Sequence, residues 1–143
     1  MLKVARDFAE IAPLPRELQQ FKIATSGGMF SRAFHLIFKA SKADIEIFLK
    51  NSPSLKNLTV TKFTKEKQYL PGQPDLDFKE LLKRDREKHK YFTPRKSTPS
   101  WYKKTIKASG RRYELKTNEG HRSFGEIIIN DSTNTVYIYV CWS

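Results

Sequence analysis

The chain has only one cysteine and no long apolar run. These two absences argue against a disulfide-linked protein and against a protein with a transmembrane helix. Cys141 is the only cysteine among 143 residues, which excludes an internal disulfide and a zinc site built from several cysteines. No run of about 18 apolar residues occurs, so no transmembrane helix is expected. Residues 1–13 lack the apolar core of a secretory signal, although a signal or anchor removed earlier stays open. These features predict a cytoplasmic protein.

The sequence also lacks the common catalytic and cofactor patterns. None of its three histidines has a second histidine three or four residues away, so the spacing predicts no zinc site. Gly27 and Gly28 belong neither to a phosphate loop nor to the Gly-x-Ser-x-Gly pattern around a nucleophilic serine. Cys141 lies in a strand-like pattern, where a cysteine is usually packed. We therefore predict no cofactor and no metal, and we favour a protein that is not an enzyme.

Aromatic residues, in contrast, are plentiful. Ten Phe, six Tyr and two Trp make up 13% of the chain. Aromatic rings bury large areas and offset the low apolar fraction of 38%, so we expect a folded core and not a disordered basic tail. A chain of 143 residues has the usual size of one domain. We predict a single domain over residues 1–143.

The N-terminal part is predicted to be a helix followed by an irregular segment. Apolar residues between Leu2 and Ile11 recur at helical spacing, and two prolines end the pattern. The remainder of residues 1–29 is ambiguous. Phe21 and Ile23 are compatible with the start of a strand, and a Ser-Gly-Gly turn follows them.

A strand, a helix and a second strand are predicted next. Residues 30–39 alternate between two faces, as a strand does. Ser41 stands three residues before Asp44 in an N-cap pattern, and the β-branched stretch 58–63 has strand character. If the two strands are adjacent and parallel, their crossover is right-handed and the sheet is mixed.

The C-terminal part carries the clearest structural pattern. A helix over about 75–91 and a proline-bounded loop at 93–100 precede it. Residues 111–116, 126–129 and 135–142 alternate and are separated by turn-forming stretches, which predicts a three-stranded antiparallel meander. One face of the last strand carries Val136, Ile138, Val140 and Trp142. The other face carries Tyr137, Tyr139 and Cys141, and is either an exposed binding patch or a second covered face.

These elements together predict the fold class. We expect an α+β domain with a mainly antiparallel sheet of about five strands, two or three helices and a C-terminal β-meander. A mixed sheet is the alternative.

Positive charge is concentrated in one segment. Residues 83–112, the basic segment, contain twelve Lys and Arg against two acidic residues, a net +10 of the +12 on the whole chain. Cations beside aromatic rings bind phosphates and stack on bases. The earlier cations are also explained by the helix dipole, which favours positive charge near the C-terminal end of the predicted helix. The candidate polyanion-binding residues are therefore the later ones: Arg95, Lys96, Trp101, Tyr102, Lys103, Lys104, Lys107, Arg111 and Arg112.

Two classes of function follow from these observations. We favour a small basic, non-enzymatic binding or interaction module, with direct nucleic-acid binding as the first alternative and an acidic protein surface as another kind of partner. A remote alternative is a metal-dependent nuclease or hydrolase. Asp75 after a proline, with Glu114 and Lys116, resembles the Pro-Asp…Glu-x-Lys signature of nucleases of the restriction-endonuclease type. The resemblance implies that the carboxylates hold a divalent ion and that the lysine activates water.

Overall fold

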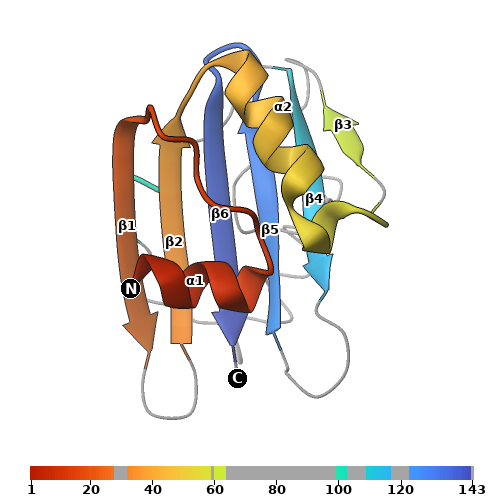
Figure 1. Ribbon diagram of the computed structural model, residues 1–143. Coiled ribbons are helices and arrows are strands. Elements are labelled where there is room, and N and C mark those ends of the chain that lie inside the picture. Colours follow the sequence, from red (N-terminus) through yellow and green to blue (C-terminus); the bar gives the residue numbers. More distant parts are fainter. Residues whose placement is uncertain (28–31, 59, 64–98, 103–108, 117–122, 143) are drawn as a thin grey trace, which may run out of the picture.

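A six-stranded antiparallel sheet with two α-helices on one of its faces forms the body of the protein (Figure 1). The computed structural model describes residues 1–27, 32–58, 60–63, 99–102, 109–116 and 123–142. The predicted α+β class with a mainly antiparallel sheet is confirmed, although the sheet has six strands where about five were expected. The predicted helix over 75–91 and most of the loop at 93–100 lie outside the described residues.

The described elements follow one another as strands and helices along the chain. Their bounds are α1 Leu2–Ala9, β1 Gln19–Gly27, β2 Arg32–Lys39, α2 Lys42–Asn51, the 3-10 helix η1 Pro53–Leu55, β3 Thr61–Phe63, β4 Gly110–Lys116, β5 Ser123–Asn130 and β6 Thr135–Trp142. Neither α1 nor α2, the α-helices of the described part of the chain, is long and apolar enough to cross a membrane.

The strand order is β1-β2-β6-β5-β4-β3, with every neighbouring pair antiparallel. The C-terminal meander β4-β5-β6 is therefore present as predicted, and its last strand lies at the centre against β2. The strands on either side of α2 do not become neighbours, because β6, β5 and β4 lie between β2 and β3. The mixed sheet considered from the sequence is thus not formed by these two strands.

Strand β1 occupies part of the segment that was ambiguous in the sequence. Most of its residues are exposed or half-buried, so the chain there has no alternating apolar pattern to mark a strand. Its pairing with β2 also shifts register between Gln19 and Lys22, and Gln20 adopts a positive φ of 54°. A bulge of this kind breaks the two-residue period on which strand prediction depends.

Hydrogen bonds of serine side chains fix both ends of α2. The Ser41 hydroxyl accepts a hydrogen bond from the Asp44 N–H at 3.1 Å and caps α2, as its sequence pattern predicts. Ser52 is fully buried after α2, where its hydroxyl donates to the Phe48 carbonyl at 2.7 Å and accepts from the Ala12 N–H at 3.0 Å. Ser52 thereby ties the chain after α1 to the end of α2.

The main core lies between the helices and the sheet face that they cover. That face carries Phe34, Leu36 and Phe38 of β2, Ile127 and Ile129 of β5, and Val136, Ile138 and Val140 of β6. Helix α2 packs Ile45, Phe48 and Leu49 on it, and α1 packs Ala5 and Ala9. The predicted shared face of Val136, Ile138 and Val140 is confirmed. Because strand residues alternate between faces, the residues between them lie on the opposite face of the sheet, away from this core.

Candidate functional site

The sheet face opposite α1 and α2, hereafter the far face, carries a row in which four of the five side chains are ionisable. Directly paired residues of antiparallel strands share a face, so the register aligns one row across five strands. Its members are Ala24, His35, Tyr139, Glu126 and Glu114. Strands lie about 4.8 Å apart, so His35 and Glu114 are separated by about 14 Å along the row.

A short aromatic segment, residues 99–102, lies against this face. In Figure 1 it is visible behind the sheet between β1 and β2, on the side away from the helices. The Tyr102 side chain is only 1% exposed, and its ring centroid lies 4.8 Å from that of His35 and 5.8 Å from that of Tyr137. Trp101 is half-buried beside it, with ring centroids 6.1 Å apart. Near Tyr137 the far face is therefore a second covered face and not an open tyrosine patch.

His35 is the least expected residue of the far face. It is 4% exposed and lies between the rings of Tyr102 and Tyr139, the latter at 4.9 Å. Burial lowers the pKa of His35 to about 4, so its imidazole is neutral near pH 7. Within the described part of the chain, its Nδ1 has no hydrogen-bond partner. The alternation along residues 30–39 predicted that His35 lies on the face of the strand opposite Phe34 and Phe38. The alternation does not predict that this second face is buried as well.

An ion pair forms the other polar centre of the far face. The Arg112 Nε of β4 donates to the Glu126 Oε2 of β5 at 2.9 Å, and the two side chains are 12% and 4% exposed. Glu114 lies directly opposite Glu126 but is exposed to solvent. Because like charges on facing strands repel, Arg112 is the group that makes a buried carboxylate tolerable there.

The two arginines predicted to bind polyanions do not converge. Successive strand residues point to opposite faces, so Arg112 lies on the far face while Arg111 lies on the helix side. Arg111 donates to Glu46 of α2 at 2.6 Å and to Asp131 of the β5–β6 turn at 2.9 Å. Both guanidinium groups are already engaged by carboxylates.

The other predicted polyanion-binding residues divide into two groups. Tyr102 is part of the core and offers no free ring, whereas Trp101 keeps partial exposure. Five members lie outside the described residues: Arg95, Lys96, Lys103, Lys104 and Lys107.

The residues of the nuclease-like pattern are only partly described. Glu114 is exposed on β4 and Lys116 ends that strand, while Asp75 lies outside the described residues. In the described ranges, no group of three or more His, Cys, Asp or Glu side chains is placed to hold a metal ion. The described part of the chain therefore gives the nuclease alternative no support.

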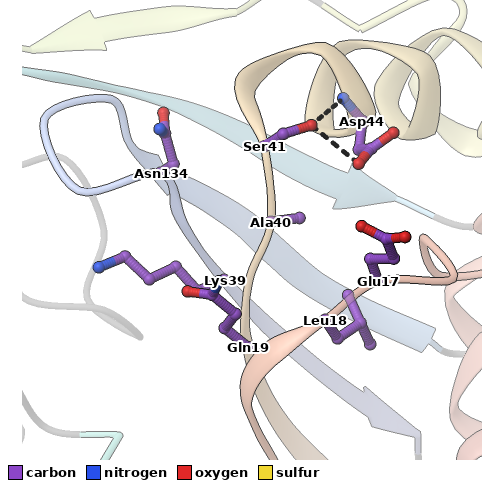
Figure 2. Close-up of a pocket in the computed structure, with 8 residues that line it drawn as sticks. All are labelled: Glu17, Leu18, Gln19, Lys39, Ala40, Ser41, Asp44 and Asn134. Carbon is purple, nitrogen blue, oxygen red and sulfur yellow. Dashed lines mark hydrogen bonds between the residues drawn. The ribbon is translucent and has the colours of Figure 1, made fainter.

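A pocket of about 310 Å³ lies elsewhere, where β1 begins and β2 leads into α2 (Figure 2). Ser41, the N-cap residue of α2, lines this pocket. Its hydroxyl accepts a hydrogen bond from the Asp44 N–H and donates one to the Asp44 carboxylate. Figure 2 shows the Lys39 side chain extending away from Ser41 and Asp44. Glu17 adds a second carboxylate to the lining. An anion in this pocket would be repelled by the carboxylates of Glu17 and Asp44, and the Asp44 N–H at the start of α2 already donates to Ser41. The lining therefore indicates no specific ligand.

The far face thus combines edge-to-face and tilted ring contacts, a buried neutral histidine and an internal ion pair. Comparison of the chain with protein-family models, with curated proteins and with solved structures finds no match. Within the described residues, the basic segment contacts the far face through Tyr102.

Proposed function

We propose that the protein is a small non-enzymatic binding module that takes a polyanion, with nucleic acid as the ligand class, through the later part of its basic segment. The supporting observation is the anchoring of that part at two points of one folded body. Tyr102 is buried on the far face against His35 and Tyr137. Gly110 begins β4 and pairs with Asn130. Lys103, Lys104 and Lys107 stand in the sequence between these two fixed points.

Charge supports a polyanionic ligand. The chain carries a net +12, and cations that replace the counterions of a phosphate backbone drive nucleic-acid binding without sequence preference. The lysines are better candidates than Arg111 and Arg112, whose guanidinium groups already donate to carboxylates. Trp101, half-buried beside the anchor, keeps ring surface for stacking on a base.

The far face favours binding over catalysis. A general base works best when its pKa lies near the operating pH and when it reaches the substrate. His35 is buried under Tyr102, and burial lowers its pKa to about 4. Glu126 is likewise committed to Arg112 and shielded from solvent. In the proposed module His35 serves by packing against Tyr102, the anchor of the basic segment.

A mobility-shift assay with labelled single-stranded DNA and RNA tests the proposal. We expect a complex at about 50 mM salt that weakens steeply as salt rises, because each phosphate contact releases counterions. The triple change Lys103→Glu, Lys104→Glu and Lys107→Glu should abolish the complex while the protein stays folded by circular dichroism.

The matched control reverses three exposed lysines on the helix side, Lys3, Lys42 and Lys56, which changes the net charge equally. This control should keep most of the binding. If wild type forms no complex at about 50 mM salt, or if both triple variants lose binding equally, the proposal is wrong. Incubation of the same oligonucleotides with magnesium tests the remote nuclease alternative, which predicts cleavage that Glu114→Ala removes.

A further inference from the structure

The two borders of the sheet differ in how much backbone they leave open. At one border β3 is only three residues long, whereas at the other β1 is nine residues long. Strand β1 pairs with β2 alone, and within the described residues its backbone makes no hydrogen bond to any other element. Figure 1 shows β1 at the left border of the sheet. Alternate N–H and C=O groups of an edge strand point outward and are available to another strand.

The bulge that protects this edge covers only the first part of β1. The bulge at Gln20 interrupts the pairing between Gln19 and Lys22. From Lys22 to Gly27 the register with β2 is regular, residue by residue. The side chains in this stretch include Ala24, Thr25 and Ser26, which are short and leave the approach to the backbone open. Six residues are enough for a short additional strand.

The charge beside this edge indicates the chemistry of its partner. Between Leu18 and Ala43 the sequence has four cations and no acidic residue: Lys22, Arg32, Lys39 and Lys42. Lys22 is exposed on the regular part of the edge strand, and Arg32 is exposed on β2 opposite Gly27. The flanking carboxylates, Glu17 and Asp44, line the pocket at the bulged end of the strand. A second copy of the chain would bring the same cations against themselves, whereas an acidic strand meets opposite charge.

Apolar groups complete the recognition pattern. Phe21 is 39% exposed, and Ile23 is half-buried on the helix side of the sheet, while Lys22 points to the far face. A strand that alternates acidic and apolar residues would place its acids beside Lys22 and its apolar side chains beside Phe21 and Ile23.

We propose that the β1 edge binds an extended acidic peptide segment of another protein by β-strand addition, with residues 22–27 supplying the backbone ladder. Main-chain hydrogen bonds provide the affinity in this mode, and the alternating side chains provide the selectivity. This site is distinct from the basic segment and does not depend on the proposed nucleic-acid binding.

The probe is a fluorescent eight-residue peptide of alternating Glu and Val, compared with a Lys and Val peptide of the same length. Fluorescence anisotropy should detect binding of the acidic peptide and not of the basic one. Hydrogen exchange should slow at the amides of residues 22–27 when the acidic peptide is present. Equal binding of both peptides, or binding without protection of residues 22–27, overturns the proposal.

Backbone substitutions separate strand addition from simple charge attraction. Ala24 and Thr25 are adjacent, so one of them points its N–H outward and the other toward β2. Of Ala24→Pro and Thr25→Pro, the outward variant should fold normally and bind the acidic peptide about tenfold more weakly, the equivalent of one lost hydrogen bond. A peptide N-methylated at alternate residues makes the same test without altering the protein. Unchanged affinity of peptides N-methylated in both alternate registers overturns the proposal.

Two further measurements exclude other occupants. The variant with Lys103, Lys104 and Lys107 changed to Glu should still bind the acidic peptide and protect residues 22–27. Loss of that binding would assign the peptide to the basic segment instead. Sedimentation of the free protein should show a monomer, and a dimer with slow exchange at residues 22–27 would assign the edge to a second copy of the chain.

Discussion

The two faces of the sheet are built from the same strands but are stabilised by different kinds of contact. On the helix side, Val136, Ile138 and Val140 of β6 join an apolar core under α1 and α2. On the far face, Tyr137 and Tyr139 of the same strand lie beside His35 and the Arg112–Glu126 pair. One face depends on buried apolar area, which tolerates many side chains of similar volume. The other face adds ring contacts and an internal ion pair to a smaller apolar cluster that includes Ile37 and Ile128. The ring contacts and the ion pair tolerate fewer substitutions than apolar area does.

This difference explains where a function can attach. The helix side is covered by α1 and α2, so its side chains are not available to a ligand. Substitutions there are expected to change the stability of the fold and not binding. The far face receives residues 99–102, so the charged chain on either side of Tyr102 in sequence is tied to the face that carries His35 and the Arg112–Glu126 pair. The comparison leads to three measurements, ordered by the expected size of their effects.

The largest effect is expected on the helix side. Phe38 is fully buried, and its ring centroid lies 5.6 Å from that of Phe48 of α2. Phe38→Ala should lower the free energy of unfolding by about 3–5 kcal/mol, because it removes buried apolar area and leaves a cavity. Guanidinium denaturation measures this change. Phe21→Ala on the exposed edge serves as the control and should cost less than about 1 kcal/mol. Equal losses for the two variants would mean that the helix side is not the main core.

The second effect separates a specific ion pair from general burial. Glu126→Ala leaves the Arg112 guanidinium largely buried without this carboxylate and should lower stability by about 3 kcal/mol. The double change Arg112→Met with Glu126→Leu should be close to wild type, because neither charge is then buried.

Glu114→Ala is the matched control for this pair, since Glu114 faces Glu126 across β4 and β5 but is exposed. It should change stability by less than about 0.5 kcal/mol. Urea denaturation of the four proteins supplies the comparison. If Glu114→Ala costs as much as Glu126→Ala, the far face is held by its acidic row as a whole and not by one pair.

The helix side was largely predictable because its signals are local and strong. Ser41 before Asp44 gave the start of α2, and strict alternation in 135–142 gave the inward face of β6. Strand β1 was not predictable with the same certainty, since its exposed residues carry no apolar period and a bulge shifts its register. The strand order was also beyond local patterns, because β6 pairs with β2 across a hundred residues of chain.

The far face was only partly predictable. Residue types alone singled out Trp101, Tyr102, Arg111 and Arg112, and alternation places the two arginines on opposite faces. Their partners are set by the register of distant elements: Glu46 lies 65 residues from Arg111, and Glu126 lies 14 residues from Arg112. No local pattern specifies such pairs, so charge that looked available for a ligand is in these two cases used within the fold.

The smallest effect at neutral pH, and the most selective for the far face, concerns His35. Its folded pKa of about 4 lies below the usual 6.5, so the neutral form is favoured by folding. Its contribution to stability is fully present above pH 6.5 and is lost as the pH falls from 6.5 toward about 4, because the unfolded chain takes up a proton first. The expected slope is about 1.4 kcal/mol per pH unit. His35→Phe keeps a ring between Tyr102 and Tyr139 and removes the titration, so the difference in unfolding free energy between the two proteins should grow with acid over this range. Carboxylates that titrate near pH 4 are common to both proteins and cancel in that difference. Parallel pH curves for wild type and His35→Phe would show that the far face opens to solvent at His35, and that Tyr102 does not anchor the basic segment there.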